Sequence, residues 1–285
     1  MTTEILAPPT PTPSGRRGRG RARTNTLTRQ SGLGLGLALT WFSLLVLIPL
    51  ALIVIQAADG GWATFRDTLT DDQTFDALRL TVEQSLLVTV VNVVMGTLIA
   101  WVLVRDRFWG KRLLEVIIDI PFALPTIVAG LVLLSLYGPR SPIGIDVSNT
   151  ERAVFLALLF VTLPFVVRTV QPVLLELDPE VEQAAASLGA SQLTTVRRII
   201  LPALAPAITA GAALSFARGI SEYGSLVLLS GNLPHTSEVA SVRILTYIEN
   251  GNEAAAASVA VLLLLVALAA ILALQLVNRW VARRG

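Results

Sequence analysis

The sequence predicts an all-α polytopic membrane protein with six transmembrane helices. Hydrophobic residues make up 53% of its 285 residues, and charged residues make up only 15%. A soluble domain carries about 25% charged residues, so this chain cannot cover a water-facing surface with charge. Six apolar segments also approach the roughly 20 residues that cross the hydrocarbon core of a bilayer. They are residues 33–57, 80–104, 116–137, 153–171, 203–229 and 256–277.

The chain before the first apolar segment is low in complexity. In residues 1–30, prolines alternate with threonines, and six arginines follow, spaced by glycine and alanine. Because such a segment cannot build a core, we expect a disordered cytoplasmic tail, with the membrane domain over 31–285. An arginine-rich run almost free of acids is also typical of an organellar transit peptide, an alternative that the sequence leaves open.

The basic residues predict the orientation of the chain. Sixteen of the 22 lysines and arginines lie in the N-terminal tail, in residues 105–115 and 168–202 and in the C-terminal tail, whereas five lie in the other loops. Loops rich in lysine and arginine stay in the cytoplasm, so both termini are predicted to be cytoplasmic. The isoelectric point near 9.5 is therefore attributed to topology and not to a surface for nucleic acid.

Isolated polar and helix-breaking residues interrupt the apolar pattern. Pro121, Pro125 and Pro164 fall within or at the ends of spans, where each removes a backbone donor, and they are interpreted as fixed bends or as hinges.

The external loop 58–79 holds five aspartates. They lack EF-hand spacing, which favours a solvated loop over a cation site. His235 is expected to be solvated in the last external loop.

The composition excludes several kinds of site. There is no cysteine and only one histidine, His235, which excludes disulfides, thiolate sites and multi-histidine metal sites. The single lysine, Lys111, precedes Arg112, so the Gly-Lys-Ser/Thr of a P-loop is absent. An intramembrane serine protease is the rival enzyme class. It needs a base at membrane depth, whereas the only histidine, His235, is expected outside the membrane. The chain itself is therefore expected to be no enzyme and to hold no metal or cofactor.

The long cytoplasmic segment 172–202 predicts a first short helix. Asp178 and Pro179 are typical of a helix start, as the capping residue and the first-turn proline. From Val181 to Leu188 the apolar residues recur at helical spacing and would form one face.

A second helix is expected after a turn at Gly189, which interrupts the first helix as a C-terminal glycine does. It would run over 191–200, and Pro202 would end it. The resulting helical hairpin carries few large side chains and suits a partner's groove. An interfacial helix packed on lipid is the alternative.

The hairpin carries a spaced motif: Q-A-A, three residues, G, nine residues, then I-x-L-P. In this spacing it resembles the E-A-A-x3-G-x9-I-x-L-P motif of binding-protein-dependent ABC importer permeases, whose cytoplasmic coupling helix docks on the ATPase subunit. Gln183 stands where the family has Glu, and Glu182 just before it either supplies that charge or leaves the contact weaker. The resemblance implies ATPase-coupling roles for Glu182, Gln183, Ala184, Ala185, Gly189, Ile199, Leu201 and Pro202.

The resemblance extends from about residue 80 to the C-terminus. The stretches 119–125, 163–172, 214–224 and 231–232 are similar to those of T-type permease subunits (CysT) of sulfate/thiosulfate importers. This implies a type I ABC importer permease fold in a bacterial plasma (inner) membrane, passing sulfate or thiosulfate inward. Molybdate permeases share part of the pattern, so a permease for molybdate, tungstate or another oxyanion is the alternative.

The resemblance also implies the partners. Because this chain has no P-loop, ATP and Mg²⁺ would be bound by a separate pair of ATPase subunits. A single hairpin per chain implies a second, related permease, expected to be of the W type. An external sulfate/thiosulfate-binding protein would deliver the anion. A passive channel, the remaining class, would have no use for an ATPase dock.

A polar stripe is predicted in the fifth apolar segment. Ser215, Arg218, Glu222 and Ser225 recur at helical spacing, and a charge inside a membrane needs a partner or a watery path. The stripe is interpreted either as the lining of an oxyanion path or as an Arg–Glu pair that fixes helix packing. Pairing with Glu222 would leave Arg218 nearly neutral, which weakens the attraction of an anion.

Overall fold

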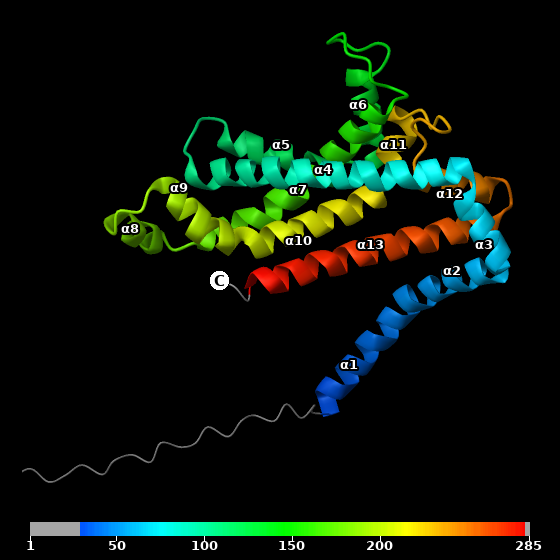
Figure 1. Ribbon diagram of the computed structural model, residues 1–285, viewed down its shortest axis with the longest axis horizontal. Helices are drawn as coiled ribbons and strands as arrows, with labels where there is room; N and C mark the ends of the chain where they lie inside the picture. The colour runs from blue at the N-terminus through cyan, green and yellow to red at the C-terminus, as the bar shows by residue number, and fades with distance from the viewer. Residues whose placement is uncertain (1–28, 283–285) are drawn as a thin grey trace, which may run out of the picture. The chain divides into compact units, whose positions relative to one another are not determined.

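The computed structural model describes residues 29–282, so the predicted tail lies almost wholly outside the described residues. Within them every regular element is helical, which confirms the predicted fold class. Two π-helical turns, Ser43–Leu47 and Val196–Ile200, interrupt the α-helices. The α-helices are α1 (Arg29–Phe42), α2 (Ile48–Asp59), α3 (Gly61–Thr70), α4 (Asp72–Arg105), α5 (Lys111–Ala123), α6 (Thr126–Tyr137), α7 (Glu151–Glu176), α8 (Pro179–Ser187), α9 (Gln192–Thr195), α10 (Leu201–Ile220), α11 (Gly224–Leu229), α12 (Ala240–Glu249) and α13 (Glu253–Ala282), as labelled in Figure 1.

The chain divides into two compact units, residues 1–49 and 50–285. In the described part of the first unit, α1 and the π-helical turn after it are apolar, and nearly all their described side chains are exposed. An apolar helix without a protein partner is typical of a lipid-facing span. Gly32–Asp59 accordingly forms a candidate span of 28 residues.

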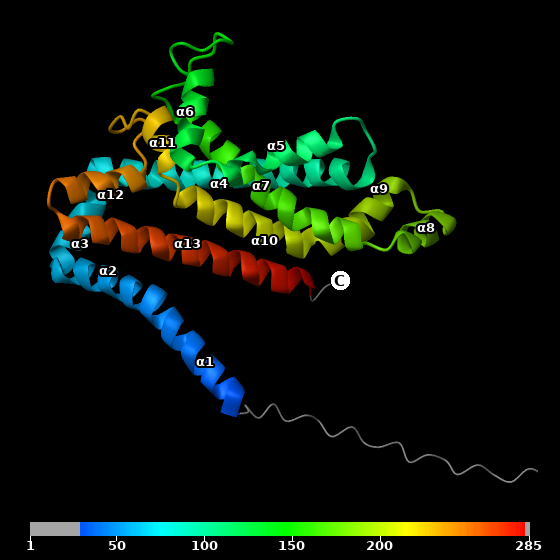
Figure 2. The ribbon, with the colours of Figure 1, turned by 180° about the vertical axis from the view of Figure 1, so that it is seen from behind.

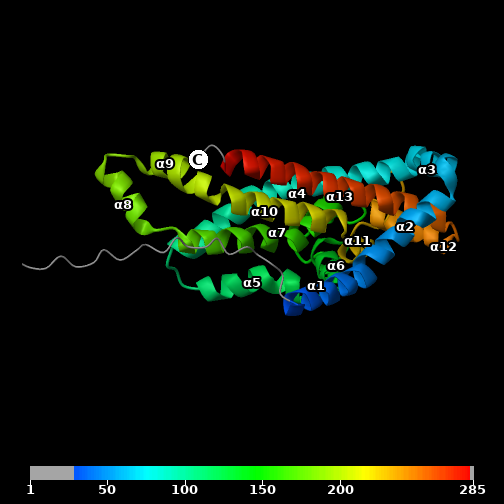
Figure 3. The ribbon, with the colours of Figure 1, turned by 90° about the horizontal axis from the view of Figure 1, so that it is seen from below.

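The second unit is a helical bundle in which α4, α7, α10 and α13 lie side by side (Figures 1 and 3). Each belongs to a helix long and apolar enough to cross a membrane. These candidate spans are Asp72–Arg105, Glu151–Glu176, Gln192–Ile220 and Glu253–Leu276. Together with Gly32–Asp59 they confirm five of the six predicted spans.

A buried amide sits at the centre of this bundle. Asn92 of α4 has no exposed surface, and its Nδ2 donates to Thr162 Oγ1 of α7 at 2.7 Å and to Ser215 Oγ of α10 at 3.3 Å. The helices meet closely beside it, because Gly96 has no side chain. A Cβ atom on Gly96 would lie 2.9 Å from Val166 Cβ. Small residues and buried amides are the usual means of holding helices together in lipid, where burial from water contributes nothing.

The third predicted span is not one straight helix. α5 and α6 are bent by 118° at Leu124–Pro125, so only the pair together forms a sixth candidate span. Leu124 is extended, as a residue before proline prefers to be, and this ends α5. The helices continue through Pro121 and Pro164, so of the three predicted proline bends only the one at Pro125 breaks a helix.

The bent pair nevertheless carries the chain from one end of the bundle to the other. Arg105, the last residue of α4, lies near Glu182, just beyond the end of α7. Glu151, the first residue of α7, lines the same hollow as Asp76 near the start of α4. Since α4 and α7 therefore run in the same direction, the segment between them traverses the bundle once.

The fifth predicted span ends earlier than expected. α10 stops at Ile220, and after a break the chain forms the separate short helix α11, which packs beside α6 (Figures 1 and 2). Glycines set this contact. A Cβ atom on Gly130 would lie 2.7 Å from the Ser225 carbonyl oxygen, and one on Gly224 would lie 2.9 Å from the Ile127 amide nitrogen.

Candidate functional site

The predicted hairpin forms through local capping. The Asp178 carboxylate accepts a hydrogen bond of 2.9 Å from the Glu180 amide at the start of α8. At its end Gly189 has a φ of +81°, and the Ala190 amide donates to the Ala185 carbonyl at 3.0 Å. The left-handed conformation requires a glycine or a residue such as asparagine. The Ser191 hydroxyl then accepts from the Thr194 amide at 3.3 Å and opens α9.

The second half of the hairpin differs from the expectation. Pro202 does not end a helix, because it follows the π-helical turn Val196–Ile200, whose altered hydrogen bonding accommodates the missing amide hydrogen. The residues from Gln192 to Ile220 consequently form one continuous helix of 29 residues. Leu193 and Ile200 therefore do not share one surface: Leu193 is exposed, and Ile200 is buried against the bundle.

Both halves of the hairpin present uncovered apolar side chains. Leu188 is 89% exposed, Leu193 is 76% exposed and Val181 is 48% exposed. Of the remaining motif residues, Gln183, Ala184, Gly189, Leu201 and Pro202 are exposed, and Ala185 and Ile199 are partly buried. This exposed apolar surface is small and faces away from the rest of the described chain, as a docking surface does.

Glu182 does not face outward with these residues. Its carboxylate forms a forked ion pair with the Arg105 guanidinium at the end of α4, with Glu182 Oε1 against Arg105 Nη2 and Oε2 3.3 Å from Nη1. Both side chains are 26% exposed. The structure therefore does not support Glu182 as a substitute for the charge that Gln183 lacks, because its charge is already paired within the chain.

The predicted polar stripe is divided by the end of α10. Arg218 Nη2 lies 2.6 Å from Glu222 Oε2, and the Glu222 side chain is 1% exposed. Glu222 Oε1 also accepts from the Ser225 amide at 2.8 Å and from its hydroxyl at 2.9 Å, so it caps the start of α11. Ser215 lies apart from this group and bonds to Asn92 instead. The structure thus brings together three of the four residues, but not on one helix face.

Sequence reasoning also missed polar links between helices, two of which lie within the bundle. One link is made by Asn92. The sequence could have indicated it, because an amide side chain within an apolar span is expected to need a polar partner. The other joins α5 to α7: Arg168 Nε donates to Asp119 Oδ1 at 2.7 Å, and Nη2 donates to Oδ2 at 2.5 Å. Arg168 also donates to Gln171 Oε1 at 2.7 Å. A bidentate pair of this kind fixes the relative position of two helices.

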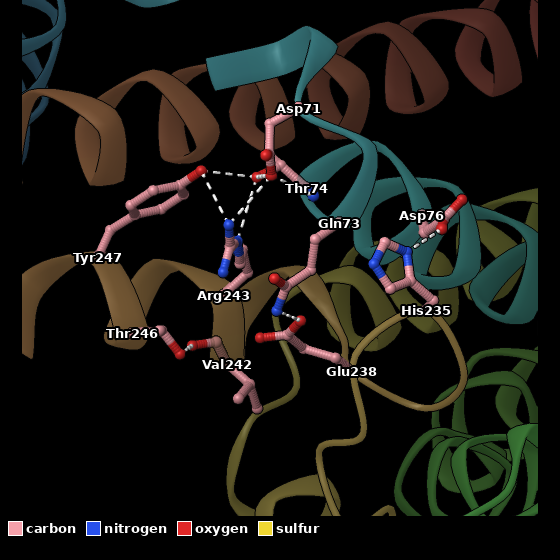
Figure 4. Close-up of polar contacts among 10 residues, drawn as sticks. All are labelled: Asp71, Gln73, Thr74, Asp76, His235, Glu238, Val242, Arg243, Thr246 and Tyr247. Carbon is pink, nitrogen blue, oxygen red and sulfur yellow. Dashed lines mark hydrogen bonds and ion pairs between the residues drawn. The ribbon is translucent and has the colours of Figure 1, made fainter. Parts of the chain in front are cut away.

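At the opposite end of the bundle, α12 is fastened to the start of α4 by polar side chains (Figure 4). Arg243 donates to Asp71 Oδ2 at 3.0 Å and to Thr74 Oγ1 at 3.1 Å, and it lies over the Tyr247 ring. Partial burial raises the pKa of Asp71, but hydrogen bonds from Thr74 and the Arg243 charge outweigh it and lower the pKa of Asp71 below its usual value. Asp71 is thus a structural cap.

His235 lies beside this cluster and is exposed, as expected for a residue in a solvated loop. Its Nδ1 is 2.7 Å from Asp76 Oδ2 (Figure 4). Both residues line a hollow of about 270 Å³. The hollow is also lined by Glu83, Glu151 and Glu238. Among the residues that the structure describes, no group of His, Asp and Glu is placed to hold a metal ion. Arg79 also lines the hollow, but the four carboxylates outnumber it, so the hollow does not suit an anion.

Curated relatives match most of the chain. "Sulfate transport system permease protein CysT" of Salmonella typhimurium is 39% identical over 248 residues, which cover 85% of this chain and 90% of the relative. The protein of the same name from Synechocystis is 39% identical over 247 residues, covering 84% of this chain and 86% of the relative. The chain is therefore similar to these proteins nearly from end to end.

Solved structures share the fold. A bacterial alginate ABC transporter in complex with a periplasmic protein contains a chain with a TM-score of 0.71 at 17% identity, over 88% of this chain and 94% of that one. The MetNI methionine ABC transporter matches with a TM-score of 0.55 at 19% identity, over 73% of this chain and 94% of that one. These likenesses confirm the type I importer permease architecture.

The family comparison agrees with the sequence motif and with the architecture. The profile described as "Binding-protein-dependent transport system inner membrane component" matches residues 92–284, which include the hairpin, α10 and α13. Since this match spans more than half of the chain, the protein belongs to the family of binding-protein-dependent transport system inner membrane components.

Proposed function

We propose that this chain is a permease subunit of an ATP-driven importer that moves sulfate or thiosulfate across the bacterial inner membrane. The observation that carries the proposal is the 39% identity over 85% of the chain to a sulfate transport permease. A match that covers 85% of the chain necessarily includes residues 172–202, which carry the coupling motif. The chain itself would then be no enzyme, because its relatives are transport permeases and it has no P-loop.

The energy would come from a pair of ATPase subunits that bind ATP and Mg²⁺ and dock on the hairpin. The uncovered Val181, Leu188 and Leu193 support this, because a small apolar surface at the end of a membrane bundle suits a groove in a soluble partner. A second permease of the W type and an external sulfate/thiosulfate-binding protein would complete the importer.

The translocation path is proposed to pass near Arg218, with Ser215, Glu222 and Ser225 in supporting positions. Arg218 is 30% exposed and is the charged member of the group that water can reach. Its pairing with the buried Glu222 favours the packing role over direct attraction of an anion. Substitutions at these two residues separate the roles, as described below.

Both termini are proposed to face the cytoplasm. We expect reporter fusions at Gln30, Arg107 and Ser191 to give cytoplasmic signals, because basic residues surround these positions. Fusions at Ser148 and Gly251 should report the external side. A cytoplasmic signal at Ser148 would mean that the bent pair α5–α6 does not cross the membrane, and the termini would then lie on opposite sides.

The anion is tested by uptake in a strain that lacks this chain. Labelled sulfate should enter only when the gene is restored, and unlabelled thiosulfate should compete with it, because both are tetrahedral dianions. Molybdate is also a tetrahedral dianion, but its longer metal–oxygen bonds make it larger than sulfate, so it should compete poorly. Restored uptake of molybdate without uptake of sulfate would reassign the chain to the alternative oxyanion class while leaving the importer assignment intact.

A further inference from the structure

One ion pair ties α8 to the transmembrane bundle. Among the side chains that the structure describes, from Gly32 to Leu276, the Arg105–Glu182 pair is the one polar side-chain contact between α8 and a transmembrane helix. The other polar side-chain contacts of α8 stay within the hairpin, where Ser187 bonds to the Gln183 carbonyl and Asp178 caps the first turn. The apolar residues Val181 and Leu188 are exposed. Apart from its chain connections, α8 therefore relies on this pair.

The pair is well suited to hold a fixed geometry. Arg105 places two guanidinium nitrogens against the two carboxylate oxygens of Glu182, and a forked pair fixes orientation as well as distance. The guanidinium also lies over the Trp101 ring, 5.3 Å from its centroid. Arg105 ends α4 and Glu182 lies in the first turn of α8, so each charge also complements the dipole of its own helix.

α4 connects this pair with the rest of the bundle. It is one continuous helix of 34 residues that carries Asn92, the amide bonded to both α7 and α10. At its other end Thr74 is bonded to Arg243, which holds α12. A displacement of α8 would pull on Arg105 and so move α4. Because α4 is one continuous helix, this movement would reach the centre of the bundle and its opposite end.

We propose that the Arg105–Glu182 ion pair is the link through which movement of the ATPase-docking hairpin reaches α4. The proposal rests on the proposed function of the hairpin as the ATPase dock. Both residues are positioning residues: they act on the path through α4 and do not contact the ATPase or the anion. Loss of the pair should therefore separate ATP hydrolysis from transport without weakening ATPase binding.

The test compares Glu182→Gln with Glu180→Gln in the purified complex with its ATPase and binding protein, reconstituted in vesicles. Glu180 lies in the same helical turn and is exposed, and in the described part of the chain its carboxylate forms no ion pair or hydrogen bond with another side chain. It therefore controls for the loss of one charge. We expect Glu182→Gln to lower the sulfate transported per ATP hydrolysed by about tenfold, within the usual range for coupling between sites. ATPase co-purification should be unchanged in both variants.

Transport by a double-cysteine variant, measured with and without a cross-linking reagent, tests the proposal even if the single variants fold poorly. The chain contains no cysteine, so Arg105→Cys with Glu182→Cys offers a unique thiol pair. A short bifunctional thiol reagent should restore part of the lost transport in this double variant, because it replaces the ion pair with a covalent bridge. Two outcomes would overturn the proposal. One is transport per ATP in Glu182→Gln equal to that in Glu180→Gln, and the other is reduced ATPase binding in Glu182→Gln alone. The proposed dock fails separately if variants of Gly189 keep both binding and transport.

Discussion

Replacing Gly189 with valine is expected to reduce ATPase binding and transport strongly while the protein stays in the membrane. No atom lies within 4 Å of the position that a Cβ would take, so the effect cannot come from a clash inside the chain. It comes from the φ of +81°, which costs an ordinary L-residue about 1–2 kcal/mol, and a β-branched one more. Such an energy changes the population of the correct turn by about 5–30-fold. Because few contacts hold α8, the turn should change conformation and misplace the docking surface.

Matched variants identify the cause. Gly189→Asn should retain most binding, since asparagine tolerates the left-handed conformation. Ala185→Arg should be less severe than Gly189→Val, and Gln183→Glu should be tolerated because it changes one exposed side chain. The measurement is co-purification of the ATPase subunit at matched membrane levels. Normal binding by both Gly189→Val and Gly189→Asp would show that the ATPase docks elsewhere.

Removing Arg218 is expected to reduce the amount of folded protein strongly. Glu222 is 1% exposed, so Arg218→Ala leaves a buried carboxylate without its counter-charge, a loss of about 3–5 kcal/mol in a buried pair. Glu222→Ala should also be damaging, because the Ser225 amide and hydroxyl lose the oxygen that accepts their hydrogen bonds. The melting temperature in detergent and the recovery of monodisperse protein measure both effects.

A pair of double variants separates charge from hydrogen bonding. Arg218→Ala with Glu222→Gln removes both charges but keeps an acceptor for Ser225, and it should restore most of the folded protein. Arg218→Ala with Glu222→Ala should not. If Arg218 attracts the anion, the restored double variant will assemble and fail to transport. Transport at the wild-type rate would instead leave Arg218 and Glu222 with a packing role alone.

The parts of the fold that sequence predicted correctly depend on local signals. The start of α8 at Pro179 and its end before Gly189 follow from capping residues within a few positions of each helix end. The long spans follow from apolar runs of bilayer length, which need no knowledge of their neighbours. In these segments the local preference and the tertiary structure agree.

The errors arose where distant contacts decide the local structure. The helix break after Ile220 depends on Glu222, which pairs with Arg218 and caps α11, and hydropathy shows only one continuous apolar run there. The Arg105–Glu182 pair joins residues 77 apart in sequence, and no spacing rule relates them. Contacts of this kind are visible only after folding.

The length of α4 shapes the end of the bundle that lies opposite the hairpin. Its 34 residues extend about 50 Å, whereas the hydrocarbon core of a bilayer is about 30 Å thick. The charged residues of α4 before Arg105, namely Asp72, Asp76, Arg79 and Glu83, all lie within its first twelve positions. With its apolar part in lipid, this first section stands above the membrane surface and carries α12 with it through Arg243. A soluble partner would therefore meet a raised helical rim and could engage it without touching the lipid headgroups.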